Sequence, residues 1–304
     1  MAQVMSNKHH EKQHTHHDLS VRKLHPSLGA EVRGVDFSKP IPEGVVASLK
    51  DLWAEHLVLV IPGQAISDQQ HVEITRHFGE PEVFHQDIFK SEKIREIFRV
   101  SNTDEDGNIM PPAHPTMKQL HGARLWHTDS SYREKPAVGS LLHGIEVSRT
   151  GGVTCFTNMY DVWAALPEQL KSKVAGRKAK HDFAHLRVVT GGREQTEEER
   201  AAMPAVWQPL VRRHPVTGRT SLYISPIYNT AIEGMADDEA IALVSELAEF
   251  ASQDRFVYRH QWETDDIVMW DNRCTMHYVT PHDPQERRVM HRTTIEGEET
   301  VVAA

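Results

Sequence analysis

The amino-acid sequence predicts a mainly β protein with flanking helices, whose short strands form a sandwich or barrel. Beyond Leu125, short strand-like runs follow one another between turns: GSLLHGIEV, GVTCFTNMY, SLYISPIY, RFVYRHQW and DIVMWDN. Helical patterns near VWAALPEQLKSKV and DDEAIALVSELAEFASQ interrupt these strands. A chain of 304 residues with 39% hydrophobic residues can bury a substantial core. Because the sequence shows neither an internal repeat nor a clean linker, we expect one domain over residues 21–304.

The first twenty residues are expected to form a disordered, histidine-rich tail. Residues 1–20 are polar, and they hold His9, His10, His14, His16 and His17 without any hydrophobic periodicity. Weak binding of a transition metal is the alternative reading of these histidines. A solvated leader is the better interpretation, because flexible ligands fix no coordination geometry.

The elements that precede the strand-rich half follow in order. From Leu28, the segment LGAEVRGVD alternates like a half-buried strand, and Pro42–His56 has the pattern of a helix. The run LVLVIPG then predicts a short buried strand. A second helix is expected over Ser67–Phe78, because Ser67 can cap its start and Gly79 can end it. Residues 80–122 are polar and rich in Pro and Gly, which is typical of a long loop that acts as a lid.

Charge and cysteine content exclude several classes of protein. The formal net charge is -9, so there is no basic excess to attract nucleic acid or an anionic membrane. No apolar run reaches the roughly 20 residues of a membrane span, and the N-terminus lacks the apolar core of a secretory signal. The only cysteines are Cys155 and Cys274, too few for a disulfide scaffold. These features predict a cytoplasmic protein in which any metal is held mainly by His and carboxylates, and they leave a homo-oligomer open.

The segment Trp126-His127-Thr128-Asp129 is the first candidate for metal binding. On an extended strand, residues two apart point to the same face, so His127 and Asp129 could share one metal. This spacing is common, and the chain has 21 histidines. A surface or hydrogen-bonded pair is therefore the simpler explanation of this motif by itself.

A third ligand becomes available in the distant run WDNRCTMH, which we interpret as strand-like and which ends in His277. Together, His127, Asp129 and His277 would form a facial triad of two histidines and one carboxylate. Such a triad leaves three coordination positions open for a bidentate co-substrate and O2. This favours iron(II) redox chemistry over a structural zinc site, which usually has four protein ligands.

Several of these motifs, taken in order, resemble the taurine dioxygenase and 2,4-dichlorophenoxyacetate dioxygenase family of iron(II)/2-oxoglutarate enzymes. The resemblance runs from Leu28 to Thr294, through LGAEVRGVD, LVLVIPGQ, WHTDSSY, TGGVT, SLYIS, WDNRCTMH and RRVMHRTT. The ordered set is far more specific than any single motif. The runs WDNRCTMH and FVYRHQW make the branch that acts on aryloxyalkanoates look closer than the taurine branch.

The resemblance implies a double-stranded β-helix, which is a jelly-roll, cupin-like core with helices packed outside. It also implies that His127, Asp129 and His277 are the ligands of Fe(II). The co-substrates would be 2-oxoglutarate and O2, and the co-products succinate and CO2.

Three further residues match positions where the family binds anions. Arg288, eleven residues after His277, corresponds to the arginine that grips the distal carboxylate of 2-oxoglutarate, and Thr154 corresponds to the hydroxyl that shares it. A guanidinium can bind both oxygens of a carboxylate, whereas lysine offers a point charge. Arg292 corresponds to a second arginine that faces the acidic group of a small anionic substrate. A surface salt bridge is the alternative role of either arginine. On a strand, Arg287 and His291 would point elsewhere.

Two other functions remain open at this stage. A taurine or alkylsulfonate dioxygenase would have the same chemistry but would release sulfite. A non-redox cupin-like protein that binds zinc, or a hydrolytic one, would act without 2-oxoglutarate. The residues that shape the substrate pocket are expected in the segments 84–122 and 223–233, where the sequence alone does not identify the substrate.

Overall fold

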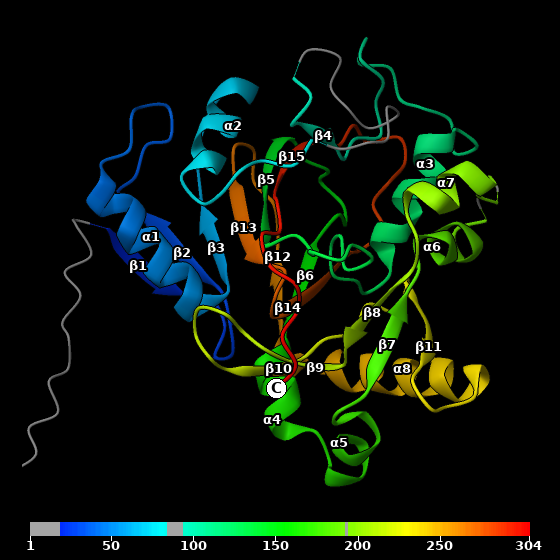
Figure 1. Ribbon diagram of the computed structural model, residues 1–304. Helices are drawn as coiled ribbons and strands as arrows, with labels where there is room; N and C mark the ends of the chain where they lie inside the picture. The colour runs from blue at the N-terminus through cyan, green and yellow to red at the C-terminus, as the bar shows by residue number, and fades with distance from the viewer. Residues whose placement is uncertain (1–18, 84–93, 192–193) are drawn as a thin grey trace, which may run out of the picture.

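The structure is a computed structural model, and it describes residues 19–83, 94–191 and 194–304. Residues 1–18 of the predicted tail lie outside the described residues, whereas Ser20, which that prediction included, begins the first strand. Residues 84–93 of the predicted pocket loop also lie outside them. In Figure 1 the strands run through the centre of the molecule, and helices lie on both sides of them.

The largest sheet has seven strands in the order β1-β2-β3-β13-β5-β15-β4. All neighbours are antiparallel except β2 and β3, which are parallel. The strands are β1 Ser20–Lys23, β2 Ala30–Arg33, β3 Val58–Ile61, β4 Phe98–Arg99, β5 Gly139–Glu146, β13 Ile267–Asp271 and β15 Val289–Ile295. Strands β3, β5 and β13 are buried on both faces over most of their length, so they read as apolar runs.

A three-stranded sheet, in the order β12-β6-β14, packs against the large one. Phe156 and Tyr258 of the small sheet share a core cluster with Val268 and Trp270 of the large sheet. Two smaller sheets, β11-β7-β8 and β10-β9, complete the β structure of the described residues. The strands are β6 Thr154–Asn158, β7 Lys178–His181, β8 Val206–Pro209, β9 Val211–Arg213, β10 Thr220–Leu222, β11 Asn229–Ile232, β12 Val257–His260 and β14 Thr275–Val279. The mixed fold with a β core and flanking helices is therefore as the sequence predicts.

Helices cover the outside of these sheets. They are α1 Glu43–His56, α2 Asp68–Arg76, α3 Pro115–Leu120, α4 Met159–Ala165, α5 Glu168–Val174, α6 Phe183–Val189, α7 Glu197–Ala202 and α8 Asp237–Ala251, with the 3-10 turns η2 His121–Arg124 and η3 Asp254–Phe256. In Figure 1, α1 and α2 lie on one side of the central strands and α6, α7 and α8 on the other. Among the described helices, none is both long and apolar enough to cross a membrane.

The first two helices form where the sequence predicts them, although α2 ends at Arg76 rather than at Phe78. Helix α1 ends at His56, and α2 begins after Ser67, whose side chain forms a capping box with Gln70. Downstream, the predicted strand GVTCFTNMY ends at Asn158, because that side chain accepts hydrogen bonds from Tyr160 N and Asp161 N and so starts α4. A proline then separates α4 from α5.

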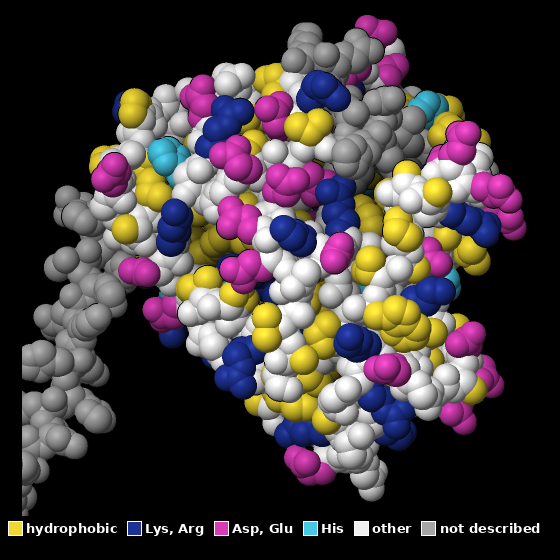
Figure 2. Space-filling view, viewed as in Figure 1, with side chains coloured by type: hydrophobic (Ala, Val, Ile, Leu, Met, Phe, Trp, Pro, Cys, Tyr) yellow, Lys and Arg dark blue, Asp and Glu magenta, His cyan; other side chains and the backbone are white. Residues whose placement is uncertain are grey.

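Charged side chains are interspersed on the surface. On the face shown in Figure 2, Lys and Arg side chains of the described residues alternate with Asp and Glu rather than gathering in one patch. The net charge of -9 is therefore not concentrated on this face.

Candidate active site

The structure brings His127, Asp129 and His277 together in the interior. Asp129 Oδ1 lies 3.8 Å from His127 Nε2, and Asp129 Oδ2 lies 3.8 Å from His277 Nε2. All three side chains are buried, and their ligand atoms lie within 4.8 Å of one another. This spacing suits three arms of one coordination sphere. The triad drawn from the sequence is thus a real cluster in space.

The secondary structure that carries these residues differs from the prediction. The WHTD segment is not a strand: His127 forms an isolated bridge with His277, and Asp129 lies in the turn that follows. The run WDNRCTMH is not one strand either, because β13 ends at Asp271 and β14 begins at Thr275. These two strands belong to different sheets. His277 therefore lies in β14, after the turn that leads from one sheet to the other.

Hydrogen bonding and burial prepare the two imidazoles as ligands. His127 Nδ1 lies 2.8 Å from the carbonyl oxygen of Leu125, so Nδ1–H donates and Nε2 keeps its lone pair for a metal. Burial lowers the pKa of His127, and it lowers the pKa of His277 well below the usual value, with His127 adding to the effect. Both rings are therefore neutral, which is the form that binds a metal.

Asp129 is the charged member of the triad. Burial acts to raise the pKa of Asp129, but the nearby Arg292, followed by the two histidines, holds it well below its usual range. Arg292 Nη1 donates to Asp129 Oδ1 at 2.9 Å, and Ser140 Oγ donates to Oδ2 at 3.0 Å. Two neutral imidazoles and one carboxylate are the donor set expected for iron(II) with open positions.

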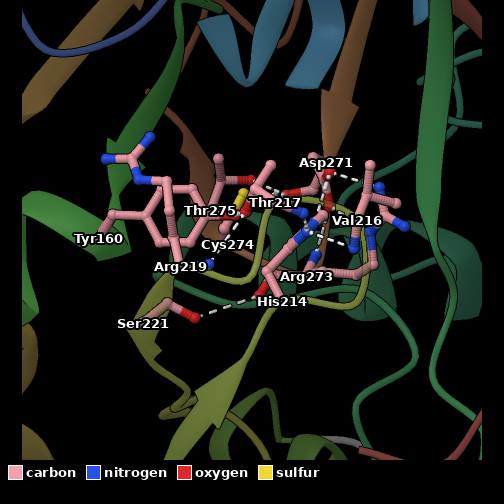
Figure 3. Close-up of polar contacts among 10 residues, drawn as sticks. All are labelled: Tyr160, His214, Val216, Thr217, Arg219, Ser221, Asp271, Arg273, Cys274 and Thr275. Carbon is pink, nitrogen blue, oxygen red and sulfur yellow. Dashed lines mark hydrogen bonds and ion pairs between the residues drawn. The ribbon is translucent and has the colours of Figure 1, made fainter. Parts of the chain in front are cut away.

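The side chains of a second cluster of potential ligands, His214, Asp271 and Cys274, form hydrogen bonds within the protein. Figure 3 shows that its polar atoms are engaged with one another and with Arg273. His214 Nδ1 accepts from the backbone N–H groups of residues 216 and 217, so Nε2–H donates to Asp271 at 3.1 Å. Arg273 binds both oxygens of Asp271, at 2.9 and 2.6 Å. Burial raises the pKa of Cys274 well above its usual value, so the sulfur stays a thiol. This cluster stabilises the turn between β13 and β14 and is not a metal centre.

Arg288 is a buried cation beside a cavity. It lies just before β15, its side chain is 6% exposed, and within the described part of the chain it has no ion-pair partner. Burial lowers the pKa of the guanidinium to about 10, so it is still charged at neutral pH. A charge left unpaired in the interior is strongly unfavourable, which argues for a bound carboxylate in the working protein. Its cavity is lined by Val100, Ser101, Asn102, Met117, Leu120, His121, Ala123, Arg124, Val279 and His282.

The GGVT turn lies beside Arg288. Gly152 adopts a φ of +66°, and a Cβ added there would lie 3.2 Å from Arg288 Nε. Thr154, two residues on, is buried at the start of β6, and its Oγ1 accepts from Trp262 Nε1 at 2.8 Å. The structure thus places the turn that leads to Thr154 next to the arginine, although the contact that it gives to the Thr154 hydroxyl is with Trp262.

Arg292 faces the triad from β15. Besides its bond to Asp129, its guanidinium carbon lies 4.6 Å from the centre of the Phe98 ring. The neighbouring side chains point elsewhere, as predicted for a strand: Arg287 pairs with Glu146, and His291 with Asp68. Arg292 thus forms a salt bridge in the structure, and its partner is the buried carboxylate of the triad rather than a group on the surface.

Comparison with known proteins identifies the family. The model of the "Taurine catabolism dioxygenase TauD, TfdA family" matches residues 20–294. The chain belongs to this family. It is a 2-oxoglutarate-dependent non-haem iron dioxygenase, and the family, enzyme class and cofactors predicted from the sequence are confirmed.

Relatives and solved structures agree with this assignment. The alpha-ketoglutarate-dependent 2,4-dichlorophenoxyacetate dioxygenase of Cupriavidus pinatubonensis is 35% identical over 274 residues, which cover 89% of this chain and 95% of that protein. The (S)-phenoxypropionate/alpha-ketoglutarate dioxygenase of Sphingobium herbicidovorans is 31% identical, with 92% and 96% covered. The crystal structure of AAD-2 with Mn(II) and N-oxalylglycine is 35% identical and has a TM-score of 0.86, with 94% of this chain and 99% of that one covered.

The dioxygenase has an apolar, aromatic cavity that opens onto the triad. In its wall, the centroid of the Tyr132 ring lies 4.7 Å from that of Phe183 and 4.9 Å from that of Tyr228. The remaining wall is formed by Phe98, Val100, Leu120, Gly122, Ala123, His127, Asp129, Ser130, Leu186, Ile227 and Arg292. Both segments expected to shape the pocket contribute to this wall. The cavity shares Val100, Leu120 and Ala123 with the cavity of Arg288.

Sequence reasoning missed several of these residues. Tyr132 and Phe183 are ordinary core aromatics in the sequence, and only their position marks them as pocket residues. Ser140 and Trp262 carry no signal of their own.

Proposed function

We propose that this dioxygenase hydroxylates a small aryloxyalkanoate-like carboxylate and releases succinate and CO2 as co-products. The observation that carries the proposal is the cavity beside the triad, which combines aromatic walls with the cation of Arg292. An aromatic ring suits the wall formed by Tyr132, Phe183 and Tyr228, and a carboxylate suits the guanidinium. Relatives named as dioxygenases of 2,4-dichlorophenoxyacetate and of (S)-phenoxypropionate support the same substrate class.

In this proposal, His127, Asp129 and His277 hold the metal through His127 Nε2, a carboxylate oxygen and a nitrogen of His277. When bound, iron(II) supplies the redox chemistry by which O2 and 2-oxoglutarate oxidise a C–H bond. The protein keeps both imidazoles neutral and the carboxylate ionised by burial and by the charge of Arg292. The ligands are therefore ready for the metal at neutral pH without releasing protons.

Arg288 binds the distal carboxylate of 2-oxoglutarate, and the Thr154 hydroxyl supports it. The planar guanidinium can engage both carboxylate oxygens, which fixes the direction in which the co-substrate lies. Because Arg288 is buried without another anion in the described part of the chain, binding removes an unpaired charge as well as forming new hydrogen bonds.

Arg292 orients the substrate. It uses Nη1 for Asp129, while its buried Nε has no acceptor in the described structure, so the guanidinium retains donors for a second anion. An acidic group held there would leave the adjoining carbon near the triad and the ring among the aromatic residues. Hydroxylation of a carbon next to an ether oxygen gives a product that collapses to a carbonyl compound and a phenol.

The proposal extends to fold and location. We assign the two facing sheets to a double-stranded β-helix of the jelly-roll, cupin-like kind within a single domain. Cys155 and Cys274 are both free thiols, which fits a reducing, cytoplasmic compartment.

A substrate panel tests the function. Purified enzyme with iron(II) and 2-oxoglutarate under air is given aryloxyacetates, both enantiomers of aryloxypropionates, taurine and alkylsulfonates, and succinate is measured. We expect succinate and phenol to form together from an aryloxyalkanoate. Sulfite from taurine or an alkylsulfonate, with no phenol from any aryloxyalkanoate, would contradict the substrate class. Turnover that does not need 2-oxoglutarate would favour a hydrolytic zinc protein instead.

A further inference from the structure

The carboxylate of Asp129 is oriented by a buried chain of hydrogen bonds that begins at Trp270. Trp270 Nε1 donates to Asn272 Oδ1 at 2.9 Å, Asn272 Nδ2 donates to Ser140 Oγ at 3.3 Å, and Ser140 Oγ donates to Asp129 Oδ2 at 3.0 Å. Every side chain in this chain of bonds is buried. Because these side chains are buried, the contacts, together with the bond from Arg292 to Oδ1, orient the carboxylate.

The direction of each bond follows from the chemistry of its first member. An indole N–H can only donate, so Asn272 must present its oxygen to Trp270 and its NH2 group to Ser140. The Ser140 oxygen then accepts from Asn272, which leaves its O–H directed at Asp129. A serine hydroxyl normally rotates to suit its surroundings. Here the bond accepted from Asn272 directs the Ser140 hydroxyl proton toward Asp129.

Among the described residues, the Asp129 carboxylate accepts hydrogen bonds from Arg292 on β15 and from Ser140 on β5. Asp129 lies in a turn rather than a strand, and the next residue, Ser130, has a φ of +53°. By contrast, Ser140 and Trp270 are opposite partners in the central strands β5 and β13. Asn272 begins the turn whose ends are held by the contacts of Asp271 and Arg273 in Figure 3. The chain of bonds therefore connects a ligand on a turn to the rigid centre of the large sheet.

We propose that Ser140, directed by Asn272 and Trp270, is a positioning residue that holds Asp129 in the orientation required for the metal. This inference rests on the proposed function, because it assumes that Asp129 is a ligand. Outer hydrogen bonds of this kind typically change metal affinity by about 10–100-fold. A serine that is merely part of the core would instead affect the stability of the metal-free protein.

The test measures Mn(II) binding to the metal-free enzyme, without 2-oxoglutarate, by titration of the free-ion electron paramagnetic resonance signal. We expect Ser140→Ala to weaken Mn(II) binding by about 10–100-fold. The control is Ser48→Ala, which removes another buried serine hydroxyl. The Ser48 hydroxyl donates to the Gly44 carbonyl within α1 and takes no part in this chain of bonds. This control should bind Mn(II) as the wild type does. The melting temperature of each metal-free variant is recorded alongside.

A second variant tests the direction of the chain of bonds. Asn272→Asp keeps the acceptor for Trp270 but replaces the NH2 donor with an oxygen, which would draw the Ser140 O–H away from Asp129. It should weaken Mn(II) binding as Ser140→Ala does. Wild-type affinity in both variants would overturn the proposal. An equal loss of affinity in Ser140→Ala and Ser48→Ala, in proportion to their melting temperatures, would also overturn it.

His127→Ala separates this outcome from failure of the proposed function. If the wild type binds Mn(II) no better than His127→Ala, the triad is not the metal site, and both proposals fall. If His127→Ala alone loses the metal while Ser140→Ala and Asn272→Asp keep it, only the role of Ser140 is wrong.

Discussion

At the scale of single residues, an assay should separate the roles of Arg288, just before β15, and Arg292, within it. Arg288→Lys replaces a two-oxygen contact with one ammonium, and we expect 2-oxoglutarate binding to weaken by about 1–3 kcal/mol. The Michaelis constant for 2-oxoglutarate checks this. Arg287→Lys is the matched control, because the adjacent Arg287 pairs with Glu146 on the surface. An unchanged constant in Arg288→Lys would remove its role.

Arg292→Gln addresses the substrate instead. An anionic substrate would lose its charged partner in a buried site, so its apparent affinity should fall by roughly 2–4 kcal/mol while 2-oxoglutarate affinity moves little. Because Arg292 also pairs with Asp129, both constants are measured at saturating iron(II). Equal weakening for both ligands, or a lower melting temperature alone, would count against an anionic substrate.

At the scale of elements, the turn before β6 should not tolerate even a methyl group in place of the Gly152 hydrogen. Gly152 and Gly176 have nearly the same backbone, with φ of +66° and +69°. Alanine at either should cost about 1–2 kcal/mol of stability from the left-handed conformation. Only Gly152→Ala should also raise the Michaelis constant for 2-oxoglutarate, because its Cβ would press on Arg288 Nε and on Ser148, whereas the space around Gly176 is open. If both variants bind 2-oxoglutarate normally, the turn does not shape that site.

At the scale of the whole molecule, burial of histidine makes stability depend on pH. His71 of α2 is fully buried against β15, and burial lowers its pKa to about 3, with the charge of His143 adding to the effect and that of Asp68 opposing it. The unfolded chain binds a proton at this residue below about pH 6.5, but the folded protein does not. Stability should therefore fall as pH drops from 6.5 toward 3.

The contribution of His71 is measurable by denaturant unfolding. At about pH 5 it should amount to a loss of about 2 kcal/mol relative to neutral pH. His71→Gln removes the titrating group and should reduce the acid-induced loss by that amount. A variant that loses stability with pH as steeply as the wild type would show that His71 is not responsible.

The sequence by itself determined the chemistry of the site. Residue type and spacing predicted His127, Asp129 and His277 as metal ligands. The anion-binding roles expected of Arg288 and Arg292 came from the resemblance of the ordered motifs to the family. The first two helices could also be predicted from local sequence, because capping at Ser67 and the apolar pattern of Pro42–His56 depend only on neighbouring residues.

Only the tertiary structure decided how these residues meet. The pairing of His127 with His277 joins a loop to a strand 150 residues away, and the partner of Arg292 proved to be Asp129. Helix α7 and strand β7 went unpredicted, because α7 buries no residue and β7 alternates over only four. Ser140 matters solely through the groups packed around it. Local pattern specifies which residues carry chemistry, whereas the direction of a buried hydrogen bond depends on segments that are adjacent only in space.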